Sequence, residues 1–377
     1  MSRRQGKSLE SFLLCGIAFI QLLSISRYLD IFYSLWTKDT FSHELRLNCS
    51  TYLFDQTKQL GGSSKYSFPT TQLPEERRDS GSELEFFQKA ADNSILTSSA
   101  TYLIVIHASS GYGPMVLNQV ASLRLIDYPR FLIACSLPSV YNYLIGYSLS
   151  ANAALVPSVW LPDNWPTNET VFGSGDYNKV TQLKLIVTRN LLLSGYTVVS
   201  VDADVVWLSS DALRVIHQQL KPSLYVLYAN DEPLLNVFNT GFYVIKPARK
   251  TVQFLDEARA IVERFGCNDQ EAVLHVLRCN WAFSWFNFAI KPLNRYQFTH
   301  TVFIWSNLHC WLNARPLVLH ATLAAGLKRK AQMLDRKWHL WLVDLDPEQF
   351  NAPKYEHNYR LRFLLTARCG NRLLNLQ

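Results

Sequence analysis

Charged residues are scarce in this chain. They make up 18% of its 377 residues, whereas hydrophobic residues make up 48%. This balance excludes an intrinsically disordered protein, which combines low hydrophobicity with high net charge. No internal repeat is present, which excludes a repeat architecture. Zinc-finger spacing and the aromatic RNA-binding signature are also missing, so we expect no nucleic-acid partner.

The chain also lacks an uninterrupted apolar run of the about 20 residues that a membrane-spanning helix needs. Residues 11–26 are apolar and uncharged, Arg27 and Asp30 interrupt the pattern, and residues 31–36 resume it. A cleaved signal peptide is one interpretation of this segment. We favour a signal anchor, because no small-residue cleavage site stands out and because nearby aromatic residues suit a membrane interface.

The sequence therefore predicts four parts. Basic residues precede the apolar segment, so we expect residues 1–10 to form a cytoplasmic tail and residues 11–36 a transmembrane signal anchor. Residues 37–99 are polar and poorly periodic, which is typical of a stem. Residues 100–377 are expected to form the folded domain, on the luminal side of the membrane.

Other features agree with a luminal location. N-glycosylation acceptor triplets begin at Asn48 and Asn168. Six of the seven cysteines would lie in the lumen, where disulfides form, although the sequence does not fix their pairing. The net charge of +7 suits an anionic ligand or surface.

Apolar strand-like runs alternate with amphipathic helical patterns after residue 100. This alternation predicts an α/β domain with a parallel or mostly parallel sheet. A polar turn at residues 239–241 is expected to lead into a strand that ends at Ile245. The other expected strands are residues 101–106, 130–135, 196–201, 224–228 and 317–320, and the expected helices are residues 115–125, 140–146, 179–194, 251–263 and 269–277.

The most informative feature is Asp202-Ala203-Asp204, which follows the buried strand at residues 196–201. Open α/β sheets bind ligands at the carboxyl ends of their strands. Alternation along a strand would point both carboxylates the same way, and buried charges are costly unless they are paired or bind metal. The pattern predicts an enzyme that uses a metal-bound nucleotide diphosphate. A helix cap or a turn is the simpler alternative for these aspartates.

Four motifs in this order resemble a known family. They are the aspartate pair within residues 199–208, residues 239–243, Asp269-Gln270, and His320 followed by Gly326 and Lys328. The set resembles the nucleotide-diphospho-sugar transferases of glycosyltransferase family 77. That family includes plant cell-wall arabinosyl- and xylosyltransferases and an amoebal galactosyltransferase. The resemblance covers roughly residues 100–340.

The resemblance implies a GT-A fold, in which a Rossmann-like, mostly parallel mixed sheet is flanked by helices. It also implies a nucleotide-diphosphate sugar as donor, Mn²⁺ or another divalent cation, and retention of the anomeric configuration. The location is expected to be the secretory pathway. With the predicted anchor, it indicates a single-pass type II Golgi membrane protein whose acceptor is a hydroxyl of a glycan or glycoprotein.

The resemblance assigns the metal to Asp202, Asp204 and His320. Two carboxylates with an imidazole suit manganese better than magnesium. A core histidine that hydrogen-bonds the backbone is the alternative for His320.

The candidates for donor binding are Lys184, Thr240, Gly326, Lys328 and Lys330, of which the resemblance covers Lys184, Gly326 and Lys328. A glycine permits close approach to phosphates, and a lysine would neutralise the leaving diphosphate. Arg189 is a rival for Lys184, and both could be ordinary exposed charges of a helix. Residues 328–330 could instead form a solvated turn.

Asp269, Gln270 and Asn239 are the catalytic candidates. In the family, the Asp269-Gln270 pair lies beside the anomeric carbon, although Asp269 could be only a helix N-cap and Asn239 only a turn residue. Retention needs either a nucleophile on the β face or a front-face transfer, and the sequence does not choose between them.

Two segments depart from the family. Residues 134–136 read Ala-Cys-Ser where an aspartate region is common, and Ala321-Thr322 replaces a segment that commonly carries asparagine. These changes affect the expected donor-base contacts and acceptor choice.

The alternatives to a transferase are a luminal glycan-binding or scaffold protein with the same fold and another metal-dependent nucleotide-processing enzyme. The latter normally needs further carboxylates for a second ion.

Overall fold

The structure is a computed structural model. It describes residues 80–95, 102–109, 111–128, 130–166, 175–220, 223–230, 238–281, 289–301, 316–322, 327–338 and 340–343. All of them belong to one compact unit, Pro74–Gln377. The predicted tail and signal anchor, both glycosylation acceptors and most of the predicted stem lie outside the described residues. None of the helices within these ranges combines the length and apolar character needed to cross a membrane.

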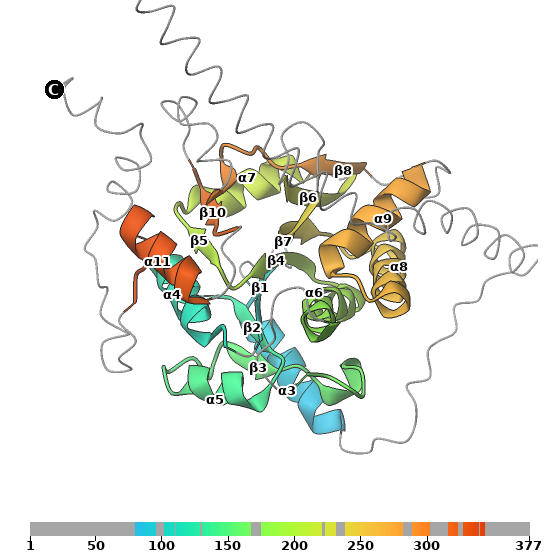
Figure 1. Cartoon of the computed structure of the whole chain (residues 1–377), viewed down its shortest axis with the longest axis horizontal. Helices are drawn as coiled ribbons and strands as arrows, with labels where there is room; N and C mark the ends of the chain where they lie inside the picture. Colours follow the sequence, from blue (N-terminus) through green and yellow to red (C-terminus); the bar gives the residue numbers. More distant parts are fainter. Residues whose placement is uncertain are drawn as a thin grey trace, which may run out of the picture. The chain divides into compact units, whose positions relative to one another are not determined.

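A mixed sheet forms the centre of the described domain (Figure 1). Its strand order is β3-β2-β1-β4-β7-β6-β8. The first four are parallel to one another, β7 is antiparallel to β4 and β6, and β8 is parallel to β6. The predicted α/β class with a parallel-rich sheet is confirmed. The strands are β1 (Tyr102–Ala108), β2 (Leu132–Cys135), β3 (Ala153–Leu155), β4 (Thr197–Asp202), β6 (Leu224–Asn230), β7 (Phe238–Ile245) and β8 (Ala289–Pro292).

A smaller sheet has the strand order β5-β10-β9. Its strand β5 follows β4 directly in the sequence. Its strands are β5 (Val205–Trp207), β9 (Phe298–His300) and β10 (Val318–His320). β10 runs antiparallel to β5, with His320 opposite Val205, and the Ala321 N–H donates to the Asp204 carbonyl at 3.0 Å. This pairing brings a segment more than a hundred residues away beside the aspartate pair.

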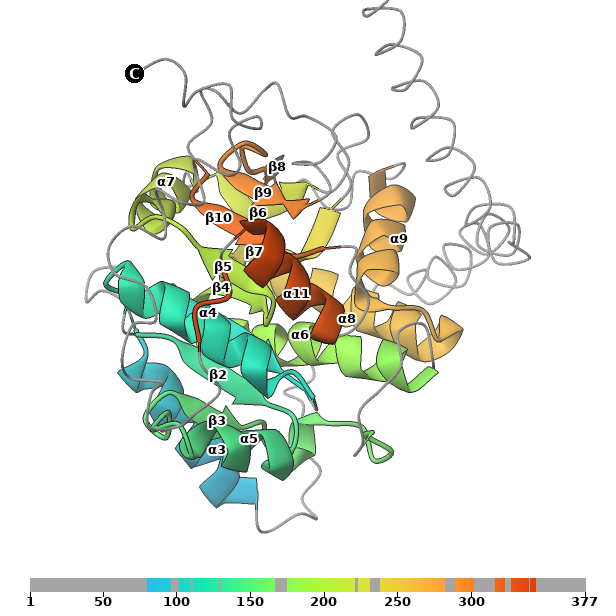
Figure 2. The ribbon, with the colours of Figure 1, turned by 60° about the vertical axis from the view of Figure 1, so that its left-hand side comes forward.

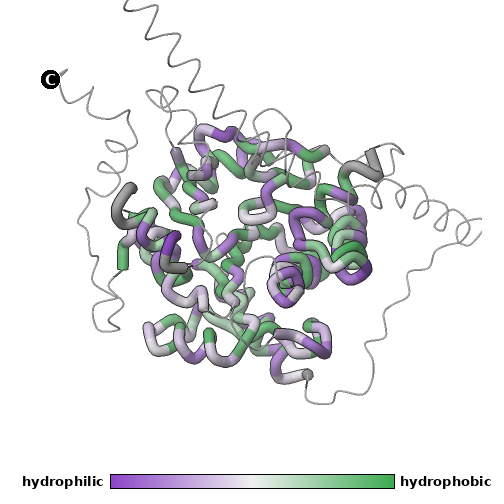
Figure 3. The backbone as a smooth tube through the Cα atoms, in the orientation of Figure 1, coloured by the Kyte–Doolittle hydropathy of each residue, from purple (hydrophilic) through white to green (hydrophobic). Residues whose placement is uncertain are grey.

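Helices lie on both faces of the large sheet. α6 (Gly175–Leu193), α8 (Arg249–Phe265) and α9 (Asp269–Trp281) cover one face, and α4 (Gly113–Leu125) and α11 (Leu327–Trp338) lie on the other (Figures 1 and 2). Apolar residues follow the central strands (Figure 3), and Val198, Val199 and Val201 of β4 are fully buried. The remaining helical segments are α3 (Ser80–Asn93), α5 (Pro138–Ile145), the 3-10 turn Ser158–Trp160 and α7 (Asp211–Gln219).

The fold differs from the sequence-based prediction in the stem and at the polar turn. α3 lies within residues 37–99, the predicted stem. Its Phe87 is fully buried and packs edge-on against Trp160, with 5.1 Å between the ring centroids, so α3 is part of the folded domain. The predicted polar turn at residues 239–241 is part of β7, where cross-strand pairing and burial replace solvent contact. The alternative of a solvated turn at residues 328–330 is wrong, because these residues belong to α11.

Candidate active site

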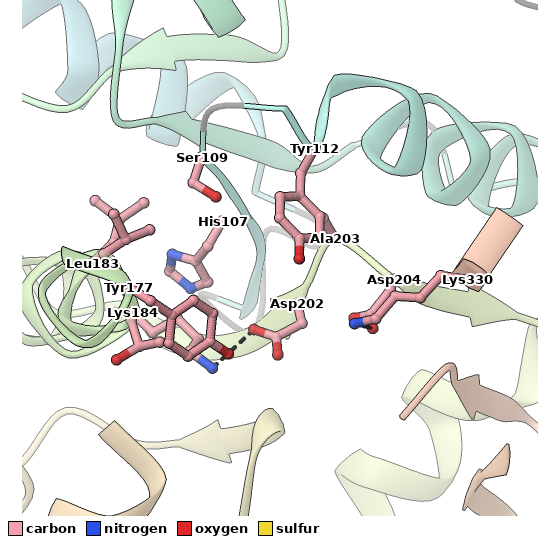
Figure 4. A pocket seen from close by; sticks show the side chains of 12 residues that line it. His107, Ser109, Tyr112, Tyr177, Leu183, Lys184, Asp202, Ala203, Asp204 and Lys330 are labelled. Carbon is pink, nitrogen blue, oxygen red and sulfur yellow. Dashed lines mark hydrogen bonds and ion pairs between the residues drawn. The ribbon is translucent and has the colours of Figure 1, made fainter. Parts of the chain in front are cut away.

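The site lies at the edge of the sheet where the parallel strands β1 and β4 end. His107 of β1 is in register with Asp202 of β4. Side chains from these strands, α6 and α11 line one cavity, which Figure 4 shows from close by. The lining includes His107, Ser109, Tyr112, Tyr177, Val180, Thr181, Leu183, Lys184, Asp202, Ala203, Asp204 and Lys330.

Asp202, Asp204 and His320 form a cluster that could hold a metal ion. One ligand atom of each lies within 4.8 Å of the others. His320 Nε2 is 3.2 Å from Asp204 Oδ1 and 3.8 Å from Asp202 Oδ2. Asp202 is the last residue of β4 and Asp204 lies in the turn to β5, so the β5–β10 pairing brings His320 to both. The sequence therefore predicted three residues that the structure brings together.

Two lysines form ion pairs with the carboxylate oxygens of Asp202 and Asp204 that do not face His320. Lys184 Nζ lies 2.9 Å from Asp202 Oδ1 and 2.9 Å from Oδ2 of Asp269. Lys330 Nζ forms an ion pair with Asp204 Oδ2. Each aspartate of the pair thus presents one oxygen to a lysine and the other to His320 Nε2 (Figure 4 shows both lysines).

Burial and charge act in opposite directions on these groups. Burial raises the pKa of the Asp204 carboxyl, but Lys330 and His320 outweigh it and hold that pKa well below its usual range. Burial lowers the pKa of the Lys184 ammonium, but Asp202 and Asp269 outweigh it and raise that pKa above its usual value. The pKa of Lys330 is raised in the same way, chiefly by Asp204, against the effect of its burial. The site therefore keeps an ionised carboxylate and two charged lysines in a buried setting.

The residues present fit a divalent cation. Two carboxylates supply hard oxygen ligands and His320 supplies a nitrogen, a mixed set that suits manganese. Gly241 of β7 leaves the space that this cluster occupies: a β carbon there would lie 2.1 Å from His320 Cε1 and 2.8 Å from Asp202 Oδ2.

The start of α9 is attached to the same region. The Asp269 N–H donates to Thr181 Oγ1 of α6 at 3.1 Å, and the carboxylate of Asp269 is only 4% exposed. The helix cap is Asn268, whose Oδ1 accepts the Glu271 N–H at 2.9 Å while Glu271 Oε2 accepts the Asn268 N–H at 3.1 Å. Asp269 is therefore left to pair with Lys184.

The polar residues of β7 connect α6 and α9 to the region of the Asp202–Asp204–His320 cluster. The Thr240 N–H donates to Gln270 Oε1 at 3.4 Å, and Lys184 Nζ donates to Thr240 Oγ1 at 3.4 Å. Asn239 Oδ1 accepts the Gly241 N–H at 2.6 Å and so fixes the backbone beside the cluster. The three catalytic candidates, Asp269, Gln270 and Asn239, are thus connected to this site.

Three other candidates have different outcomes. Arg189, the rival of Lys184, forms an ion pair with Asp256 of α8 at 2.5 Å and is not part of the cavity lining. Gly326 lies outside the described residues, as does the side chain of Lys328.

Sequence reasoning missed His107, Ser109, Tyr112 and Tyr177 in the cavity lining. A signal for the first three was present, because these polar and aromatic residues follow the first buried strand. The carboxyl ends of parallel strands meet at one edge of a sheet, so this segment was bound to lie beside Asp202.

Residues 151–334 match the family model described as nucleotide-diphospho-sugar transferase. This part of the chain belongs to that family. The family recognised from the four motifs is therefore confirmed, and its matched range contains all of the predicted site residues.

The chain is similar to two curated proteins of Arabidopsis thaliana. One is the beta-arabinofuranosyltransferase RAY1, with 23% identity over 176 residues, 45% of this chain and 32% of the relative. The other is the arabinosyltransferase RRA2, with 23% identity over 194 residues, 45% of this chain and 42% of the relative. The matches thus span less than half the length of either relative.

Among solved structures, the chain is similar to the glycosyltransferase GlyE of Streptococcus pneumoniae TIGR4. The similarity has a TM-score of 0.42 and 14% sequence identity, and it covers 65% of this chain and 61% of that one.

Proposed function

We propose that this protein is a metal-dependent glycosyltransferase. It transfers a hexosyl or pentosyl group from a nucleotide-diphosphate sugar to a hydroxyl of a glycan or glycoprotein, with retention of the anomeric configuration, on a GT-A fold. The observation that carries the proposal is the Asp202–Asp204–His320 cluster at the carboxyl edge of a parallel-rich sheet. The family match over residues 151–334 supports the choice of donor class.

One set of residues would bind the cation, and the lysines would add positive charge beside the diphosphate. Asp202, Asp204 and His320 would hold the cation, which when bound would neutralise the charge that develops on the leaving diphosphate. Lys330 of α11 pairs with Asp204 and brings a second positive charge to this edge. Lys328 and Gly326 stay candidates for phosphate contacts from the same segment. Preorganised positive charge of this kind stabilises a departing anion without reorganisation during the reaction.

The sugar would lie on the β7 side of the cation. Thr240, Asn239, Gln270 and Asp269 supply hydroxyl, amide and carboxylate groups there, and Lys184 joins Asp269 to the metal cluster. Because Asp269 is buried and paired, its carboxylate is held in place and can accept hydrogen bonds from sugar hydroxyls. Either a nucleophile on the β face or a front-face transfer would give retention at this position.

A nucleotidyltransferase or phosphatase with a second cation is less consistent with the site. Such enzymes place two ions close together and need further carboxylates. In the part of the chain that the structure describes, Asp202, Asp204 and His320 are the acidic and imidazole groups found gathered for a metal.

We further propose that the protein is a single-pass type II protein of the Golgi membrane. The proposal is supported by the basic flank before residues 11–36 and by the acceptor triplets at Asn48 and Asn168. The transferase domain would then face the lumen.

A donor screen tests the proposed function. The detergent-solubilised full chain is incubated with Mn²⁺ and a panel of nucleotide sugars, beginning with nucleotide-linked arabinose, xylose and galactose, and release of nucleoside diphosphate is measured. We expect release from at least one donor, and none in EDTA. The same assay on Asp211→Asn, an exposed aspartate of α7, is the matched control for substitutions in the cluster. Folded protein that releases nucleoside diphosphate from no donor would favour the glycan-binding or scaffold alternative.

A further inference from the structure

Another cavity lies between α6 and α8, outside the proposed donor site. We call it the α6–α8 cavity. Its volume is about 320 Å³, within the range of roughly 300–1,000 Å³ that is usual for small-molecule pockets. The residues that line it include Asn164, Asn178, Lys179, Gln182, Val262 and Glu263. They are distinct from the residues that line the cavity in Figure 4, and the proposed function assigns them no role.

The two cavities lie on different faces of α6, which packs beside α8 (Figure 1). Val180 and Lys184 line the first cavity, and Lys179 and Gln182 line the α6–α8 cavity. At roughly 3.6 residues per turn, these two pairs point to nearly opposite sides of the helix. The wall between the cavities is therefore one helix thick, about 10 Å.

A series of hydrogen bonds connects the α6–α8 cavity to Asp269. Asn178 Nδ2 donates to the Gly266 carbonyl at 2.6 Å, and Thr181 Oγ1 donates to the Asn178 carbonyl at 2.8 Å. Thr181 Oγ1 in turn accepts the Asp269 N–H at 3.1 Å. These bonds hold the α6–α8 cavity at a fixed position relative to the proposed sugar site.

The wall of the α6–α8 cavity suits a hydroxyl-rich ligand. The amide side chains of Asn164, Asn178 and Gln182 contain both hydrogen-bond donors and acceptors. Pro162 and Val262 add apolar surface. A sugar ring has C–H groups that can pack on apolar surface and hydroxyl groups that can bond to amides. Apolar lining with a few polar groups is the usual composition of a small-molecule site.

The charged residues of the α6–α8 cavity are paired. Lys179 Nζ lies 3.4 Å from Asp176 Oδ1, and Glu263 Oε1 lies 3.6 Å from an Arg259 nitrogen. Each charge is thus balanced by an opposite charge on its own helix. A neutral ligand is therefore favoured over an ion.

We propose that the α6–α8 cavity is an accessory subsite for a neutral acceptor oligosaccharide. It binds a sugar unit other than the one that receives the transferred sugar. This inference rests on the proposed function and adds to it the class of acceptor. An acceptor that reaches both cavities must span the width of α6, so it must contain more than one sugar unit. The subsite then strengthens the binding of longer acceptors and leaves monosaccharides unaffected.

Two variants remove amides from the cavity wall. Gln182→Ala removes a side chain that is 4% exposed, and a thermal melt shows whether this variant folds. Asn164→Ala is the second variant, because Asn164 is exposed and its truncation leaves the core intact. Gln253→Ala is the matched control. Gln253 is an exposed residue of α8 whose amide donates to Glu257 Oε1 at 3.1 Å.

Acceptor kinetics on the full chain in detergent test the proposal. Each protein is assayed with Mn²⁺, the preferred donor and neutral xylo-, arabino- and galacto-oligosaccharides, together with the corresponding monosaccharides. For the longer acceptors we expect Gln182→Ala and Asn164→Ala to raise KM about tenfold with kcat within about twofold, because the lost hydrogen bonds are equal in the ground state and the transition state.

The other measurements should match the wild type. These are the KM of Gln182→Ala and Asn164→Ala for monosaccharides, their release of nucleoside diphosphate without an acceptor, and all parameters of Gln253→Ala. A release assay that stays at the wild-type level shows that the donor site is intact.

Other outcomes overturn distinct claims. If KM for the longer acceptors is unchanged in the folded variants, or rises equally for monosaccharides, the α6–α8 cavity is not an accessory subsite. A fall in kcat at constant KM would instead indicate a structural effect through Asp269 and contradict the proposal. A wild type that releases nucleoside diphosphate but transfers to none of the oligosaccharides also contradicts it. A folded wild type that releases nucleoside diphosphate from no donor contradicts the proposed function itself.

Discussion

Gly241 faces His320 so closely that a β carbon on Gly241 would lie 2.1 Å from His320 Cε1. The same β carbon would lie 2.8 Å from Asp202 Oδ2. Strand β7 thus passes the Asp202–Asp204–His320 cluster at a distance that only glycine allows. The glycine of the sequence Asn239-Thr240-Gly241, expected to belong to a turn, is instead required by close packing inside a strand.

Gly241→Ala is expected to displace His320 or Asp202 and to weaken the binding of a nucleoside diphosphate with Mn²⁺ at least about tenfold, since a misplaced ligand loses much of its bond to the ion. Calorimetry measures the affinity. Gly81→Ala is the matched control, because a β carbon at Gly81 of α3 would meet nothing within 4 Å. A folded Gly241→Ala protein with wild-type affinity would show that the cluster does not bind the ion.

Lys184 offers a test of the buried charge network. Lys184→Met keeps the length of the side chain and removes the charge that faces Asp202 and Asp269. Loss of one partner of a buried ion pair is costly, so we expect a decrease of roughly 3 kcal/mol in the free energy of unfolding. Denaturant titration at neutral pH measures the change.

Lys179→Met is the control for the Lys184 variant. Lys179 lies on the same helix, and its ion pair with Asp176 is exposed to solvent. Exposed pairs contribute about 1 kcal/mol or less, so this variant should be nearly as stable as the wild type. Equal stability of Lys184→Met and Lys179→Met would contradict the network described for Lys184.

Much of the fold could be predicted from local patterns. Strand β4 is a run of buried β-branched residues that follows Gly195, which has a φ of +88° at the end of α6. The alternation of strands and helices then fixed the α/β class. Short strands such as β5 and β9 have three residues each and carry too little periodicity to be recognised.

The site was predicted only as far as its motifs were recognisable. Asp202 follows a strand pattern, but His320 was joined to it through resemblance, because the β5–β10 pairing is a long-range contact that no local pattern encodes. The sequence could not choose between Lys184 and Arg189 as the donor-binding residue. That choice depends on which face of α6 meets the cavity and which meets Asp256 of α8. His107 was missed because a single histidine at the end of a buried run resembles an ordinary core residue.

Asp204→Asn tests the charge of the metal cluster. The amide is nearly the size of the carboxylate but neutral, so it is expected to reduce turnover at least about a hundredfold, or roughly 3 kcal/mol in activation free energy. Turnover and thermal midpoint are measured on one preparation, with Asp211→Asn as the exposed control. Normal turnover by folded Asp204→Asn protein would remove Asp204 from the catalytic centre.

Membrane topology is testable independently of catalysis. If residues 11–36 anchor the chain with its C-terminal domain in the lumen, carbonate extraction should leave the protein in the membrane pellet. Glycosidase treatment should increase its gel mobility through loss of glycans at Asn48 or Asn168. Asn48→Gln together with Asn168→Gln should abolish that shift. A soluble, unglycosylated product would contradict the proposed topology.

The most direct test of the account compares nucleoside diphosphate affinity with and without a divalent ion. The full chain in detergent is titrated by calorimetry with the preferred nucleoside diphosphate in Mn²⁺ and again in EDTA. Because Asp202, Asp204 and His320 are proposed to bind the diphosphate through the cation, we expect affinity to fall at least about a hundredfold in EDTA. Equal affinity in Mn²⁺ and in EDTA would contradict the metal-bridged donor site.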